Sequence, residues 1–121
     1  MKIHESAENY LETILVLEKK KDFVRSIDIA NEMNFSKPSV SIAMSKLREN
    51  GYIHMNNEGH IFLLEPGREI AEKIYERHNV IARWLIDRGV PENIALEDAC
   101  RIEHVISEET FTAIKKEALS K

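Results

Sequence analysis

The feature that most constrains the fold is a change of hydrophobic rhythm after Gly51. Up to that residue, apolar side chains recur at helical spacing in three successive segments. The stretches YIHMN and HIFLL that follow are typical of two short strands, and the NEG between them predicts a tight turn with Gly59 at a positive φ. The chain therefore begins as helix, helix, turn, helix and hairpin.

Each of the three helical segments carries its own start signal. SAENYLETILVLEKKK predicts a first helix with Ser6 as its N-cap, and SIDIANEMN predicts a short second helix that Ser26 caps. In SKPSVSIAMSKLRENG, Pro38 fits only the first turn of a helix, because a proline has no N–H to donate. The buried stripe of this third helix should consist of three apolar residues, Val40, Met44 and Leu47.

The second half of the sequence is helical throughout. A long helix is expected from 67 to 88, closing at Gly89, then one from Pro91 to about 106, and a last one that Ser107 caps. The composition changes near residue 65. The expected fold is mostly α with a small β-hairpin, made of a winged helix-turn-helix domain (1–65) and an all-helical domain (66–121).

Composition and charge exclude several classes of protein. Apolar residues make up 43% of the 121, but no run approaches the roughly 20 apolar residues that a spanning helix needs. The single cysteine and the lack of an apolar leader at MKIHESAENY predict a reducing, cytoplasmic setting with no membrane partner. A net charge of −4 argues against indiscriminate coating of nucleic acid, although one face can still be basic.

The third helical segment has the properties of a DNA recognition helix. In a winged helix-turn-helix, the helix after the turn lies in the major groove and the hairpin contacts the flanking backbone. Between Phe35 and Arg48 there are three basic residues and no acidic one, within an acidic protein. The residues expected to contact DNA are Arg25, Ser36, Lys37, Pro38, Ser39, Ser41, Ile42 and Lys46.

A second cluster lies in DACRIEHVI, which contains the only cysteine. On a helix, Cys100, Glu103 and His104 share one face, and a thiolate, a carboxylate and an imidazole together bind a borderline divalent ion. His78 is the one polar member of an otherwise apolar helical stripe. Glu12 and Asn9, three residues apart on the first helix, are further candidate ligands. A satisfied core histidine and a buried cysteine are the plainer alternatives.

The whole chain resembles the diphtheria-toxin-repressor family of metal-dependent transcriptional repressors, which includes iron- and manganese-dependent regulators. The resemblance is carried by AENYLETI, SKPSVSIAMSKL, ERHNVIARWL and, most specifically, EDACRIEHVISEE. It implies that Cys100, Glu103 and His104 belong to the main regulatory metal site and that His78 is also a ligand. Glu12 matches a ligand of manganese-type members, and Asn9 falls where the family uses methionine or aspartate.

The sequence also departs from the family pattern. Iron-type members build an ancillary site at places that hold Ala82 and Leu96 here, so that site should be absent or altered. The sequence ends at Lys121, so a short form without the SH3-like third domain is expected.

The resemblance implies a regulator without enzymatic activity. Neither a small organic substrate nor a membrane is expected among its partners. Its partners would be a palindromic double-stranded operator and a second copy of the chain. The surface between copies is expected in the second half, among Trp84, Leu85, Ile86, Val90, Ile94, Ile106 and Phe111. A metal held by ligands from both halves would set the spacing of the two recognition helices.

A thiolate ligand favours Fe(II) over Mn(II), whereas Glu12 favours Mn(II); Zn(II), Co(II) and Ni(II) are possible substitutes. The expected activity is repression of metal-uptake genes. Two alternative functions remain. One is a winged-helix regulator that senses no metal and has a structural Cys/Glu/His cluster. The other is an enzyme with Cys100 as nucleophile, which is disfavoured because no oxyanion-hole motif is visible.

Overall fold

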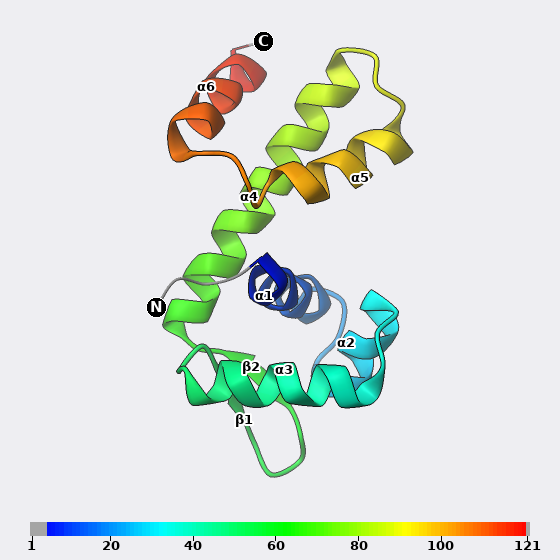
Figure 1. Ribbon diagram of the computed structural model, residues 1–121, viewed down its shortest axis with the longest axis vertical. Coiled ribbons are helices and arrows are strands. Elements are labelled where there is room, and N and C mark those ends of the chain that lie inside the picture. Colours follow the sequence, from blue (N-terminus) through cyan, green and yellow to red (C-terminus); the bar gives the residue numbers. More distant parts are fainter. Residues whose placement is uncertain (1–4, 121) are drawn as a thin grey trace. The chain divides into compact units, whose positions relative to one another are not determined.

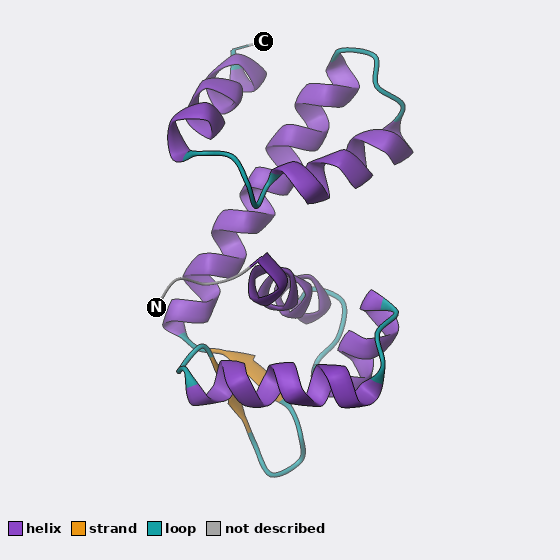
Figure 2. Cartoon of the chain, in the orientation of Figure 1, coloured by secondary structure: helices purple, strands orange, loops and turns teal. Residues whose placement is uncertain are grey.

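The computed structural model describes residues 5–120 and confirms the predicted fold class. Three helices, a small hairpin and three more helices follow one another along the described chain, and the ribbon can be followed in Figure 1 and Figure 2. Their bounds are α1 (Glu5–Glu18), α2 (Ser26–Met33), α3 (Lys37–Glu49), β1 (Ile53–Met55), β2 (Ile61–Leu63), α4 (Glu65–Asp87), α5 (Glu92–Ile102) and α6 (Glu108–Leu119). The chain forms two compact units that divide between Glu72 and Lys73, within α4. The predicted domain boundary after residue 65 falls in the first turn of the same helix.

The first unit is a helix-turn-helix with a hairpin wing, built around one apolar core. Helix α1 supplies the largest part of this core, and the predicted stripe of α3 is buried as expected. The core residues are Leu11, Ile14, Leu15, Leu17, Val24, Ile29, Ala30, Val40, Met44, Leu47, Ile53, Ile61 and Leu63. Burial of this apolar surface is the main free-energy term that holds the three helices together.

The turn between α2 and α3 uses a left-handed residue that is not glycine. Asn34 has φ 58°, and the amide of the next residue, Phe35, donates to the carbonyl of Ala30 at 3.0 Å. Asparagine tolerates this conformation better than most residues, and it ends α2 abruptly. Ser36 then starts α3, because its Oγ accepts from the amide of Ser39 at 3.3 Å.

Two of the N-caps assigned from sequence, Ser6 and Ser26, were wrong. Helix α1 already includes Glu5, so Ser6 is not its N-cap. Helix α2 has Arg25 as its N-cap and Ser26 as its first residue; the carboxylate of Asp28 accepts from the Arg25 amide at 2.9 Å. A hydroxyl residue next to a helix start is a common signal. Here the acidic side chain three residues after the cap takes the capping role instead.

The wing is a two-stranded antiparallel hairpin in which His54 lies opposite Phe62. Gly59 has φ 80°, as the turn requires, and Asn56 closes the loop by accepting from the amides of Glu58 and His60. The amide of Ile61 also donates to the carbonyl of Val24 at 2.7 Å. The segment before α2 therefore supports one edge of the wing.

The second unit has a smaller core in which Ile81 and Ala82 of α4 pack with Ala99 of α5 and Phe111 of α6. This corrects one expectation, since Phe111 was counted among surface residues between copies and is 4% exposed. Leu85 and Ile106 also pack partly against this core. Ile86 and Ile94 remain exposed, together with Leu96 and Val105. Among residues 5–120, no helix is long and apolar enough to cross a membrane.

Candidate DNA interface and metal centre

Helix α3 presents one buried face and one polar, basic face. The residues assigned to DNA contact on this helix and its N-cap are all exposed: Ser36, Lys37, Pro38, Ser39, Ser41, Ile42 and Lys46. Ile42 is 60% exposed, an unusual placement for isoleucine on a helix that has a well-filled core side. The shallow surface hollow around it is lined by Ser41, Ser45 and Lys46, with the carboxylate of Glu49 at the end of the helix. A small apolar group among hydroxyl and ammonium groups is suited to a thymine methyl beside phosphates.

Arg25, the remaining residue assigned to DNA contact, is engaged within the protein. Its guanidinium donates to Nε2 of His60 at 2.9 Å and to the carbonyl of Glu58 at 3.5 Å. A guanidinium can only donate, so Nε2 of His60 is the acceptor in this contact. His60 is buried and stacks on Phe23 with ring centroids 4.2 Å apart. Arg25 therefore connects the start of α2 to the wing, and its contact with DNA stays a prediction.

The predicted metal ligands of the second unit converge on Glu103. This carboxylate is fully buried. Nδ1 of His78, on α4, donates to Oε2 of Glu103 at 3.1 Å, and Nε2 of His104 lies 3.3 Å from Oε1. A buried charge is costly unless it is paired. One carboxylate between two imidazoles is a nitrogen and oxygen donor set that suits a first-row divalent ion.

The backbone around these ligands differs from the continuous helix expected to about residue 106. Helix α5 ends at Ile102; Glu103 is its C-cap in the right-handed helical region, and His104 lies in the turn that follows. Glu103 still keeps helical backbone angles, so the expectation of one shared helical face holds only as far as this residue. Cys100 is exposed on the last turn of α5. Its ligation of a metal stays a prediction.

The two candidates from the first unit lie on α1, three residues apart and both partly buried. The carbonyl of Asn9 accepts from the hydroxyl of Thr13 at 2.8 Å, a contact within α1. The roles of Glu12 and Asn9 as ligands stay predictions. At the places of the ancillary site, Ala82 and Leu96 have side chains without a donor atom.

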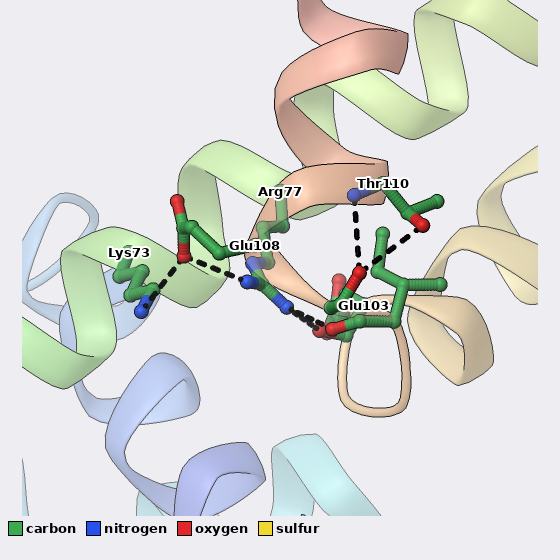
Figure 3. A network of polar contacts seen from close by, with 7 residues as sticks. Lys73, Arg77, Glu103, Glu108 and Thr110 are labelled. Atoms are coloured by element: carbon green, nitrogen blue, oxygen red, sulfur yellow. Dashed lines mark hydrogen bonds and ion pairs between the residues drawn. The ribbon is translucent and has the colours of Figure 1, made fainter.

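Sequence reasoning missed Arg77, whose buried guanidinium holds the turn that carries Glu103 and His104. As Figure 3 shows, Arg77 lies between this turn and the start of α6. One terminal nitrogen, Nη1, donates to the carbonyls of Glu103 at 3.1 Å and Ile106 at 3.0 Å. The other, Nη2, donates to the carboxylate of Glu108 at 3.1 Å. The signal in the sequence was an arginine directly before His78, the one polar member of the inward stripe of this helix.

A winged helix-turn-helix with an exposed basic helix, followed by a helical unit with an imidazole–carboxylate cluster, defines a metal-dependent DNA-binding regulator of transcription. Residues 2–61 match the family described as iron dependent repressor, N-terminal DNA binding domain. Residues 64–118 match its partner, the iron dependent repressor metal binding and dimerisation domain. The chain belongs to the iron-dependent repressor family.

Individual relatives and structures agree with this assignment. The chain is 32% identical over 111 residues to the transcriptional regulator MntR of Escherichia coli, covering 92% of this chain and 72% of the relative. It is 33% identical over 113 residues to the iron-dependent repressor IdeR of Mycobacterium tuberculosis, covering 93% and 49%.

Among solved structures, a manganese-dependent transcriptional repressor in complex with manganese shares the fold at a TM-score of 0.85 and 24% identity. That match covers 93% of this chain and 52% of the repressor. IdeR of T. acidophilum matches with a TM-score of 0.76 and 26% identity, covering 97% and 55%. The chain thus spans about half the length of these two structures.

Proposed function

We propose that this chain represses transcription by binding a palindromic operator as a homodimer when a divalent metal, Fe(II) before Mn(II), is bound. The observation that carries the proposal is the fully buried Glu103 between His78 and His104, in the unit that matches a metal-binding and dimerisation domain. A buried carboxylate that faces two imidazole nitrogens has little purpose in a purely structural core, where an apolar residue would pack at lower cost.

The proposed ligands are His78, Glu103 and His104, joined by Cys100 and by Glu12, with Asn9 as a further oxygen donor. The first three are supported by the distances between their donor atoms. The other three are supported by the family resemblance. When bound, the metal would supply a positive charge that neutralises the carboxylates and holds the ligand-bearing elements together.

The order of metals is argued from donor chemistry. Manganese prefers oxygen ligands, whereas a thiolate favours softer ions, so ligation by Cys100 would favour Fe(II). The relatives include an iron-dependent repressor, IdeR, and a manganese-dependent repressor is among the solved structures with the same fold. Co(II), Ni(II) and Zn(II) would bind as substitutes, because these later divalent ions generally bind a nitrogen and sulfur site at least as tightly as Fe(II) does.

The response to metal would arise from linkage between two binding sites. If metal and operator favour the same conformation, each raises the affinity of the other by an equal factor. A coupling of about 1–3 kcal/mol corresponds to a 5- to 150-fold change in operator affinity. In the homodimer, the two α3 helices would read half-sites about 34–36 Å apart, or a multiple of that spacing.

The proposal is tested by selecting duplexes from a random DNA library with the Mn(II)-loaded protein under anaerobic conditions. Fluorescence anisotropy on the selected DNA is then measured with Fe(II), Mn(II), Zn(II) and without metal. We expect tight binding only with metal, tightest with Fe(II), and selected sequences with two-fold symmetry. The variant His104→Ala should stay folded and lose the response. Equal binding with and without metal would refute metal control, and a response retained by His104→Ala would refute the ligand assignment.

A further inference from the structure

We infer that Arg77 is a positioning residue for the metal site, and that it transmits metal binding to α6; this rests on the proposed metal site at Glu103 and His104. Arg77 does not need to touch the ion. It holds the short turn, residues 103–106, on which two of the proposed ligands lie.

The geometry of the turn makes this role specific. Nη1 of Arg77 reaches the first carbonyl of the turn, on Glu103, and the last, on Ile106. Both carbonyls lie beyond the end of α5 and therefore have lost the helical partners that an interior carbonyl would have. Because one guanidinium nitrogen donates to both carbonyls, it fixes the separation of the two ends of the turn, and with it the directions of the side chains between them.

The same guanidinium is held in place from the side of α6. Nη2 donates to Glu108, the first residue of α6, and the guanidinium carbon lies 5.2 Å from the centre of the Phe111 ring. Lys73 binds the same carboxylate at 3.1 Å. These two cations lower the pKa of Glu108, Lys73 contributing first and Arg77 second. The carboxylate is thus ionised near neutral pH and anchors Arg77.

Arg77 also directly precedes His78, the third proposed ligand, in the sequence. His78 follows it on α4 and contacts Glu103 with its imidazole. Neighbouring residues on one helix therefore hold Glu103 in two ways: His78 at the carboxylate and Arg77 at the backbone carbonyl. Arg77 is only 6% exposed, so its guanidinium is held within the protein by the contacts described above. Outer-shell groups of this kind typically contribute 10- to 100-fold to metal affinity.

The test compares Arg77→Lys with the parent, with Lys73→Gln as matched control and His104→Ala as the ligand-loss reference. Lysine keeps the charge, but its ammonium is a single point and cannot span two carbonyls and a carboxylate. Affinity for Mn(II) is measured by calorimetry, and the Co(II) absorption spectrum reports the coordination geometry. Hydrogen exchange of the 108–119 segment, with and without Mn(II), reports transmission to α6.

For Arg77→Lys we expect about a 10- to 100-fold loss of Mn(II) affinity, an altered Co(II) spectrum and no metal-dependent protection of α6. Lys73→Gln should match the parent in all three, since Lys73 does not contact the turn. A folded Arg77→Lys protein with parental affinity and spectrum would overturn the inference. If the parent itself bound no Mn(II), the proposed function would fail instead, so the two failures are distinguishable.

Should Arg77→Lys not fold, Glu108→Gln decides the matter. Glu108 is exposed and its change leaves the two carbonyl contacts possible, but it removes the ionised anchor of the guanidinium. We expect Glu108→Gln to weaken Mn(II) binding several-fold more than Lys73→Gln does. Equal Mn(II) affinities for Glu108→Gln, Lys73→Gln and the parent would overturn the inference.

Discussion

Replacing Gly67 with alanine should destabilise the first unit, although the same change stabilises most helices. Gly67 is the third residue of α4 and has no special backbone angle that would require glycine. In an ordinary helix position, alanine would be favoured over glycine by about 0.5–1 kcal/mol. A Cβ at Gly67 would lie 2.2 Å from the carbonyl oxygen of Tyr52 and 3.3 Å from Leu11.

The carbonyl of Tyr52 cannot easily move away. It accepts a hydrogen bond from the amide of Leu64 at 3.0 Å, directly before α4 begins. Arg68, the next residue along α4, is also bound to Glu18 of α1 at 3.1 Å. The start of the helix would have to shift by about 1 Å to reach an ordinary contact distance, and overpacking of this kind costs about 1–3 kcal/mol. Because the clash is with a backbone atom and not with a flexible side chain, the cost should lie in the upper half of that range, about 2–3 kcal/mol. Subtracting the gain in helix propensity leaves a net loss of about 1–2 kcal/mol.

The assay is urea unfolding of metal-free protein followed by circular dichroism. Glu69→Ala is the matched control, because Glu69 is an exposed residue on the same helix and its truncation should stay within about 0.5 kcal/mol of the parent. Gly67→Ala should lower the unfolding midpoint with an unchanged dependence on urea. A variant as stable as the parent, or more stable, would show that propensity outweighs the contact and would refute the argument.

Three further predictions concern DNA, pH and metal. Ile42→Ala should cost about 1–3 kcal/mol on the selected operator and little on random DNA; equal weakening on both, in anisotropy titrations, would remove Ile42 from the base-reading set. Burial by itself raises the pKa of Asp28, but the Arg25 amide and the Lys21 ammonium outweigh it, so the pKa lies below its usual 3.8. Because the ionised form is the stabilised one, Asp28→Asn should lower the free energy of unfolding by about 0.5 kcal/mol at pH 7. That difference should vanish as pH falls below 3.8, and a constant difference down to pH 2 would contradict it. Glu12→Gln should weaken Mn(II) binding and remove most of the coupling to DNA while leaving metal-free DNA affinity unchanged; unchanged coupling in calorimetric titrations would mean that Glu12 is no ligand.

Much of the architecture was predictable because its signals are local. The burial of Val40, Met44 and Leu47 follows from helical periodicity within α3, and the exposed basic face is what remains of that helix. Gly59 marks the wing turn because few other residues adopt a positive φ there. The grouping of His78 with Glu103 and His104 was also expected, partly from spacing and partly from the family resemblance.

Only the tertiary structure decided which hydrogen-bond donors pair with which acceptors. Arg25 looked like a phosphate contact, but its partners His60 and Glu58 lie 35 and 33 residues away in the chain. The partners of Arg77 lie 26, 29 and 31 residues away. An arginine has the same five donors wherever it occurs, and no local pattern reveals which distant carbonyls need them. Gly67 is a similar case, since the sequence shows a helix start, whereas the need for glycine comes from a carbonyl at residue 52 that only folding brings near.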